Sequence, residues 1–167
     1  MKFIKFIFIV IIFILTSYVI FHIGKTYYTK INTVKFTIPE GYTNSQIGQA
    51  LEKSGLVTQT DFINEVQNWT DNSYWFLKGV PNDNHKLDGF LYPSTYSFSK
   101  KTSSKVIINQ MLKTFEKNVE PNKEYITKNK LNIRSIVIIA SLIEKEAGKD
   151  VDRPKISSVI YNRLNKN

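Results

Sequence analysis

The chain begins with a long apolar run. Residues 6–21 read FIFIVIIFILTSYVIF, and the apolar character continues to Gly24. A segment spanning residues 6–24 is close to the ~20 apolar residues that a bilayer-spanning helix requires. A cleaved signal peptide would have a shorter apolar region and a small-x-small cleavage site, and neither is present. We therefore predict a single-pass transmembrane anchor over residues 6–24.

Short lysine-containing segments border this run on both sides. Residues 1–5 form an N-terminal flank, and residues 25–33 predict a juxtamembrane linker. Charge does not set the orientation of the span, because lysines lie on both sides of it: Lys2, Lys5, Lys25 and Lys30. The long C-terminal remainder favours an N-terminus inside the cell and a domain outside it.

The next part of the chain combines a strand pattern with a helix pattern. Val34–Ile38 (VKFTI) alternates as a strand does and ends at the turn signal Pro39-Glu40-Gly41. Thr43 then has Gln46 three residues later, which is a capping-box pattern and predicts the start of a helix. Gly55 is expected to end that helix.

A second short helix is predicted from Thr60 or Asp61 to Trp69, followed by a polar loop over residues 71–86. Within this loop, residues 75–77 (WFL) predict an anchoring turn. Residues 87–98 (LDGFLYPSTYSF) contain a Gly–Pro turn and then an alternation typical of a strand. We expect this strand to pair with Val34–Ile38, which makes residues 34–98 a small βαα(β) unit.

Residues 99–167 predict a mainly helical domain, because several segments show helical periodicity. The predicted elements are a helix from Ser103 or Ser104 to Val119, a basic connector Lys123–Lys130, a helix Ile133–Gly148, and a last helix opened by Asp150 or Asp152 with Pro154 in its first turn. The predicted fold class is therefore α+β: a transmembrane helix, a small α+β subdomain and a mainly helical domain.

Two glutamates end the apolar helix Ile133–Gly148 on different faces. At about 100° per residue, Glu146 continues the line of Ile136, Ile139 and Ile143, whereas Glu144 points to nearly the opposite side. A carboxyl held against apolar side chains has a raised pKa and can act as a general acid. The alternative is a structural helix that ends in solvated charge, with Gly148 as its C′ residue.

Composition limits the available chemistry. The absence of cysteine excludes disulfides and thiol nucleophiles. The two histidines, His22 and His85, lie far apart in the sequence, which argues against a histidine metal site. We expect neither a metal nor a cofactor. The formal net charge of +9 fits nucleic acid, anionic lipid or an anionic envelope polymer. No nucleic-acid-binding motif is present, so a nucleic acid partner is not expected.

Four segments resemble one known family in order and spacing. They are Ile38–Thr43 (IPEGYT), Leu87–Tyr96 (LDGFLYPSTY), Ala140–Glu146 (ASLIEKE) and Ser158–Leu164 (SVIYNRL). Together they resemble the endolytic murein transglycosylases, the MltG or YceG-like family. The resemblance implies a cell-membrane protein with one N-terminal span, a LysM-like peptidoglycan-binding subdomain at residues 34–98 and a catalytic domain outside the membrane.

The resemblance also implies an activity and its residues. It assigns Glu146 as the catalytic acid of a lyase that cleaves the β-1,4 bond between N-acetylmuramic acid and N-acetylglucosamine and leaves 1,6-anhydro ends. Tyr92 and Asn162 are candidates for transition-state contacts, and Arg163 for holding a substrate carboxylate. Peptidoglycan is the expected substrate, and the peptidoglycan synthesis or division machinery is an expected partner.

The resemblance breaks at the C-terminus. The family's catalytic domain continues beyond the Asn-Arg-Leu of residues 162–164, so we expect residues 99–167 to be a partial, C-terminally truncated catalytic domain. Such a domain would expose apolar faces of its last two helices. The alternative function is a non-catalytic, membrane-anchored peptidoglycan-binding or scaffold protein, which would need no Glu146.

Overall fold

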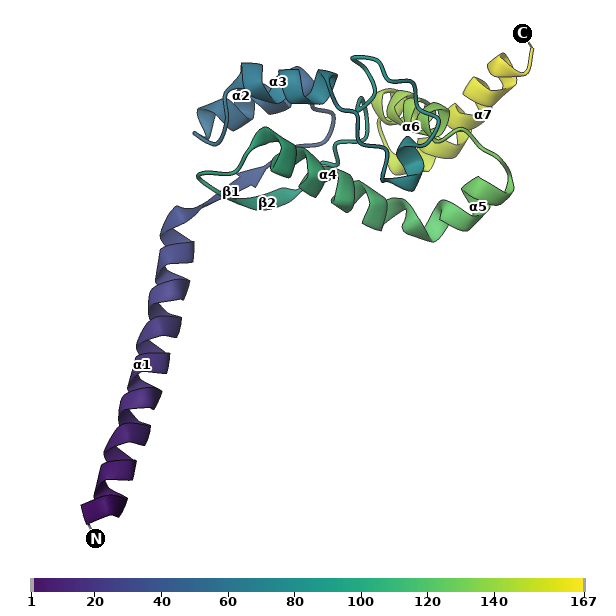
Figure 1. Cartoon of the computed structure of the whole chain (residues 1–167). Coiled ribbons are helices and arrows are strands. Elements are labelled where there is room, and N and C mark those ends of the chain that lie inside the picture. Colours follow the sequence, from purple (N-terminus) through teal and green to yellow (C-terminus); the bar gives the residue numbers. More distant parts are fainter. Residues whose placement is uncertain (1, 167) are drawn as a thin grey trace.

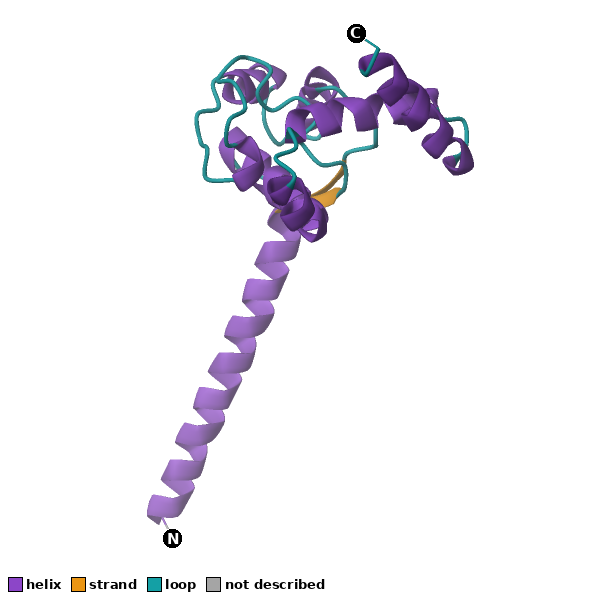
Figure 2. Cartoon of the chain, turned by 90° about the vertical axis from the view of Figure 1, so that its right-hand side faces the viewer, coloured by secondary structure: helices purple, strands orange, loops and turns teal. Residues whose placement is uncertain are grey.

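The computed structural model describes residues 2–166 and has the predicted α+β class, with helices far outnumbering strands (Figures 1 and 2). Its helices and strands are α1 (Lys2–Asn32), β1 (Thr33–Thr37), α2 (Asn44–Lys53), α3 (Gln59–Gln67), β2 (Thr95–Ser99), α4 (Ser104–Val119), α5 (Lys123–Lys128), α6 (Ile133–Glu146) and α7 (Arg153–Leu164). Short 3-10 turns occur at Trp75–Leu77, Glu120–Asn122 and Asp150–Asp152.

Helix α1 extends away from the rest of the molecule (Figure 1). Its segment Ile9–Thr26 has a mean hydropathy of 1.9, and none of it is buried. The predicted linker at residues 25–33 is not a separate spacer, because α1 continues to Asn32 and β1 starts at Thr33. No glycine or proline follows Gly24 in this segment, so nothing in the backbone ends the helix earlier.

The two strands form a small antiparallel sheet, and this confirms the predicted pairing. Phe36 of β1 lies opposite Tyr96 of β2, and Val34 lies opposite Phe98. Because successive side chains alternate between faces, these aromatic residues enter the core while the intervening residues face outward. The strands come from positions about sixty residues apart in the chain, so the sheet closes the whole segment between them.

Helices α2 and α3 fill that closed segment and pack against each other. The capping box is confirmed: the Thr43 hydroxyl accepts from the Gln46 amide, and the Gln46 side chain accepts from the Thr43 amide at 2.8 Å. Gly55 follows α2 with a positive φ of +72°, as the predicted helix end requires. Helix α3 begins at Gln59 because the Thr58 hydroxyl caps it, one or two residues before the predicted start.

An aromatic cluster joins the 3-10 turn at residues 75–77, the loop before β2 and α4. The ring centroid of Phe76 lies 5.5 Å from that of Phe90 and 4.8 Å from that of Phe115, and the Phe90 and Phe115 rings meet edge to face at 5.2 Å. The predicted anchoring turn at residues 75–77 therefore supplies a fully buried ring to the core. One core extends over residues 36–133.

The last two helices are less well covered. Ile133 of α6 is buried, whereas Ile138 and Leu142 of α6 and Leu164 of α7 are exposed. Helix α7 packs on α6 and has no buried residue. The expected exposure of apolar side chains on these two helices is found.

Candidate functional site

The N-terminal end of helix α6 contacts the loop at residues 83–90, which lies before β2 in the chain. The Asn132 side chain caps it by accepting from the Ser135 amide at 3.0 Å. Arg134 donates to the His85 carbonyl oxygen at 3.3 Å and lies 3.7 Å from an Asp83 carboxylate oxygen. These contacts hold α6 against the loop that carries residues 83–90.

A glycine allows the same loop to approach α6 closely. Gly89 has a φ of +82°, and it lies directly against the side chain of Val137. Phe90 and Leu91, which follow Gly89, are buried. The loop and the N-terminal half of α6 therefore form one packed unit.

Glu146 is the last residue of α6, and its side chain is exposed. The expected apolar enclosure of this carboxyl is wrong for the described chain, because the three isoleucines of its face are only half-buried. Gly148 follows the C-cap residue Ala147, whose backbone is extended. Gly148 does not have the positive φ that a C′ glycine usually adopts.

A cavity of about 410 Å³ lies beside the contact between α6 and α7. Its lining includes Ala140, Ile143 and Glu144 of α6, and Arg153, Pro154 and Ser157 of α7. Glu144 thus faces a cavity, although the helical-face argument placed it on the outer side. Arg153 and Ser157 were not predicted, and Pro154 at the start of α7 was the only sequence signal nearby.

The remaining predicted site residues lie in two places. Tyr92 is half-buried in the loop before β2, where its carbonyl oxygen accepts from the Tyr96 hydroxyl at 2.6 Å. Asn162 and Arg163 are exposed on the last turns of α7. Among residues 2–166, Glu146 forms no hydrogen bond or ion pair with any of these three.

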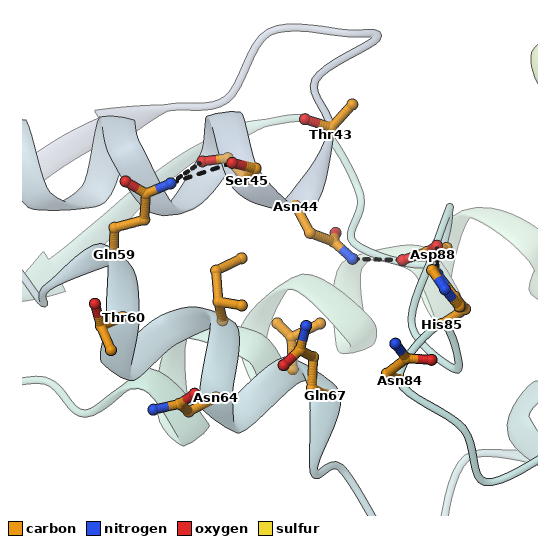
Figure 3. Close-up of a pocket in the computed structure, with 12 residues that line it drawn as sticks. Thr43, Asn44, Ser45, Gln59, Thr60, Asn64, Gln67, Asn84, His85 and Asp88 are labelled. Atoms are coloured by element: carbon orange, nitrogen blue, oxygen red, sulfur yellow. Dashed lines mark hydrogen bonds and ion pairs between the residues drawn. The ribbon is translucent and has the colours of Figure 1, made fainter.

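A second pocket of about 520 Å³ lies between α2, α3 and the loop at residues 84–88 (Figure 3). We call it the amide groove, because its lining is rich in amide and hydroxyl side chains: Thr43, Asn44, Ser45, Gln59, Thr60, Asn64, Gln67 and Asn84, with His85, Asp88, Ile63 and Val66. This groove was not predicted from the sequence. Its only signal was the density of Asn, Gln, Ser and Thr in two distant segments.

Asp88 connects the two walls of the amide groove. One carboxylate oxygen accepts from the Asn44 side-chain amide at 2.7 Å, and the other lies 2.9 Å from Nδ1 of His85 (Figure 3). Gln59 donates across the helix pair to the Ser45 hydroxyl at 3.1 Å. These bonds fix polar groups at the groove without filling it.

One lysine is buried next to the groove loop. The Lys86 side chain is fully buried, and its ammonium donates to Asn82 Oδ1 at 2.9 Å. Burial lowers the pKa of Lys86, and the nearby Asp71 charge partly opposes this shift. The pKa of Asp71 is lowered, chiefly because its carboxylate accepts the Ser73 backbone amide at 2.7 Å.

Among residues 2–166, no three His, Asp or Glu side chains lie close enough together to bind a metal ion. The two candidate sites are the end of α6 with its neighbouring cavity, and the amide groove.

Comparison with known proteins gives consistent matches. The YceG-like family model matches residues 19–167. The endolytic murein transglycosylase of Streptococcus pneumoniae serotype 2 (strain D39) is 35% identical over 145 residues, covering 78% of this chain and 26% of that protein. The protein of the same name from Bacillus subtilis (strain 168) is 35% identical over 142 residues, covering 79% of this chain and 39% of that protein.

A solved structure agrees with these matches. The crystal structure of a YceG-like protein from Listeria monocytogenes superposes with a TM-score of 0.65 at 32% sequence identity, covering 80% of this chain and 47% of that one. The chain spans about a quarter to two fifths of the length of the curated relatives it matches. Because the family model covers most of the chain, this protein belongs to the YceG-like family.

Proposed function

We propose that this chain acts in the endolytic, non-hydrolytic cleavage of peptidoglycan glycan strands. The observation that carries the proposal is the family match over residues 19–167, which includes Glu146 and both helices around the α6–α7 cavity. Its relatives from Streptococcus pneumoniae and Bacillus subtilis are named endolytic murein transglycosylases. The activity is thus that of a lyase acting on peptidoglycan.

The proposed catalytic group is Glu146. Glycoside hydrolysis usually requires two carboxyl groups, but a transglycosylase can use the O6 hydroxyl of the muramic acid as its nucleophile. Glu146 gives its proton to the O4 oxygen of the leaving N-acetylglucosamine while the C1–O4 bond breaks. The O6 oxygen then bonds to C1, its proton passes to the Glu146 carboxylate, and a 1,6-anhydro end results.

The exposure of Glu146 is compatible with a polymeric substrate. A glycan strand that covers the C-terminal end of α6 would exclude water from this carboxyl during proton transfer. Asn162 and Tyr92 are proposed to contact the sugar near the transition state. Arg163, exposed on α7, is proposed to bind a lactyl or stem-peptide carboxylate with its guanidinium group.

The proposed location is the cell membrane. Helix α1 has the length and hydropathy of a bilayer span, and its apolar side chains from Ile9 to Tyr18 are unburied. We propose that it anchors the chain, with the domain on the extracytoplasmic side where peptidoglycan lies. Synthases or division proteins of the same compartment are the proposed partners.

A second candidate function is peptidoglycan binding without catalysis. The amide groove favours it, because side-chain amides and hydroxyls at fixed positions suit the hydroxyl and acetamido groups of amino sugars. The order β1–α2–α3–β2 is that proposed for a LysM-like subdomain. Peptidoglycan binding of this kind requires the amide groove but does not require the Glu146 carboxyl.

Product analysis separates the two functions. The full chain in detergent is incubated with purified peptidoglycan, and soluble products are identified by mass spectrometry. Transglycosylase action yields fragments with 1,6-anhydro-muramic acid ends, which are 18 Da lighter than hydrolysis products because no water is added. The absence of anhydro ends, together with retention of the chain on insoluble peptidoglycan, would favour the binding function.

A further inference from the structure

The entire net charge of the chain is confined to two segments. Residues 1–39 and 89–115 contain nine lysines and no acidic residue, whereas the rest of the chain contains fourteen basic and fourteen acidic residues. The two segments therefore account for the whole formal charge of +9, and the remainder is balanced. Lys2 and Lys5 lie at the start of α1, far from the domain, so the other lysines of these segments make the region around the sheet positive.

The fold brings these two segments together. They contribute the paired strands β1 and β2, and the Lys100 amide donates to the Asn32 carbonyl oxygen, at the end of α1, at 2.9 Å. Lys35 is exposed opposite Ser97, and Lys100 and Lys101 are exposed just after β2. Figure 1 shows the sheet at the end of the domain from which α1 leaves.

The outward side of the sheet carries hydroxyl groups beside these lysines. Thr37 and Thr95 hydrogen-bond across the strands at 2.9 Å, and Ser97 and Ser99 are exposed on the same side. We define the basic sheet face as Lys35, Ser97, Ser99, Lys100 and Lys101. Ammonium and hydroxyl groups donate to phosphate oxygens, and the basic sheet face contains no carboxylate to repel them.

The basic sheet face lies at the depth of lipid headgroups if α1 spans a bilayer. Asn32 follows Thr26, the end of the apolar segment, by six residues, or about 9 Å at the helical rise of ~1.5 Å per residue. Each headgroup layer is about 5–8 Å thick, and electrostatic attraction in physiological salt extends a further ~8 Å. Lys100, bonded to Asn32, is within that distance.

We propose that the basic sheet face docks on anionic phospholipid headgroups and holds the domain against the bilayer in one orientation. This inference rests on the proposed membrane anchoring by α1. Each lysine near an anionic surface shifts the ratio of docked to undocked domain by about fivefold, so three lysines together change it by about a hundredfold. Neutral bilayers give no such attraction.

The chain lacks cysteine, so one introduced cysteine gives a single site for a thiol-reactive label. Ser97→Cys in the full chain carries an environment-sensitive fluorophore on the basic sheet face. The chain is reconstituted into vesicles of phosphatidylcholine alone or with 30% phosphatidylglycerol, each containing a headgroup-attached quencher. We expect severalfold stronger quenching in the anionic vesicles, and loss of the difference in about 0.5 M salt.

Matched charge variants test the residues. In the labelled chain, Lys35→Gln, Lys100→Gln and Lys101→Gln together should reduce quenching in anionic vesicles to the level in neutral ones. The control removes the same charge from the balanced part, at Lys117, Lys128 and Lys155, which are exposed and form no ion pair among the described residues. This control should quench like the parent chain.

Vesicle flotation separates the inference from the anchoring on which it rests. A chain that does not float with neutral vesicles would overturn the anchoring itself. A chain that floats with both vesicle types but is quenched equally in each would overturn only the docking on anionic lipid. Quenching that soluble polyphosphate alters in neutral vesicles, with no effect of anionic lipid, would assign the surface to a soluble polyanion and overturn the lipid proposal.

Discussion

A Cβ atom placed on Gly89 would lie 2.5 Å from Cγ1 of Val137, which is closer than non-bonded carbon atoms approach in folded proteins. Gly89 also has a φ of +82°, a backbone conformation that other residues rarely adopt. Val137 lies on α6, one turn after the Arg134 contacts with the loop. This glycine therefore sets how closely the loop before β2 approaches the helix that ends in Glu146.

Gly89→Ala should destabilise the fold by about 2–4 kcal/mol, because it adds the left-handed backbone cost of ~1–2 kcal/mol to the cost of the overlap. Gly41→Ala is the matched control, since Gly41 has a similar φ of +74° with nothing within 4 Å of its Cβ position. It should cost only the backbone term. Adding Val137→Ala should recover part of the Gly89→Ala loss; urea unfolding in detergent that showed no recovery would contradict the steric argument.

Glu146→Gln should lower the rate of anhydro-muropeptide release by roughly 10²–10⁴-fold, the usual contribution of a general acid–base group. Glutamine keeps the shape and a hydrogen-bonding oxygen but cannot transfer a proton. Glu144→Gln, two residues away beside the α6–α7 cavity, should stay within about tenfold of the parent. Equal losses from both variants would indicate a shared structural effect and count against Glu146 as the acid.

Asp88→Ala should weaken binding of glycan fragments to the amide groove by roughly fivefold, because it frees the Asn44 amide and the His85 ring from fixed positions. Isothermal titration with chitin-type or muropeptide oligosaccharides measures the change. Glu40→Ala removes an exposed acid outside the groove and serves as the control. If both variants bind alike, the groove is not the glycan site.

Lys86→Met should leave the free energy of unfolding at neutral pH unchanged or raise it by about 1–2 kcal/mol, because it removes a buried ammonium paired with a neutral amide. The pKa of Lys86 is lowered, so the native state releases this proton before the unfolded chain does. The parent chain should therefore gain stability as pH rises towards 10.5, and Lys86→Met should not show this gain.

Lys86→Ala separates packing from charge. It removes the same charge but leaves a cavity beside Leu87 and should cost about 2–3 kcal/mol. Urea denaturation of the three proteins across pH 7–10 measures both effects. A Lys86→Met chain as unstable as Lys86→Ala would mean that the ammonium itself stabilises the fold.

Asp71→Asn should reduce the loss of stability in acid. The pKa of Asp71 is lowered in the fold, so its stabilisation is present above the unfolded value of 3.8 and is lost as pH falls through the lower folded value. Thermal unfolding between pH 5 and pH 2 should show a shallower decline for Asp71→Asn than for the parent. Glu52→Gln, an exposed carboxyl on α2, should decline like the parent.

Local sequence determined most of the secondary structure of this protein. The apolar run, the Thr43–Gln46 capping box, Gly55 and the alternation in residues 34–38 and 95–99 are short-range signals, and each specifies its element through neighbouring backbone contacts. The family resemblance likewise depended on short motifs, and the match over residues 19–167 confirms it.

The tertiary structure alone decided what surrounds the candidate residues. A helical wheel placed Glu146 in line with apolar side chains, but burial depends on which elements cover that line, and the described chain leaves Glu146 exposed. The amide groove joins Asn44 to Asp88, and the basic sheet face joins Lys35 to Lys100. Both require contacts between residues more than forty positions apart, and their geometry follows from packing rather than from any local pattern.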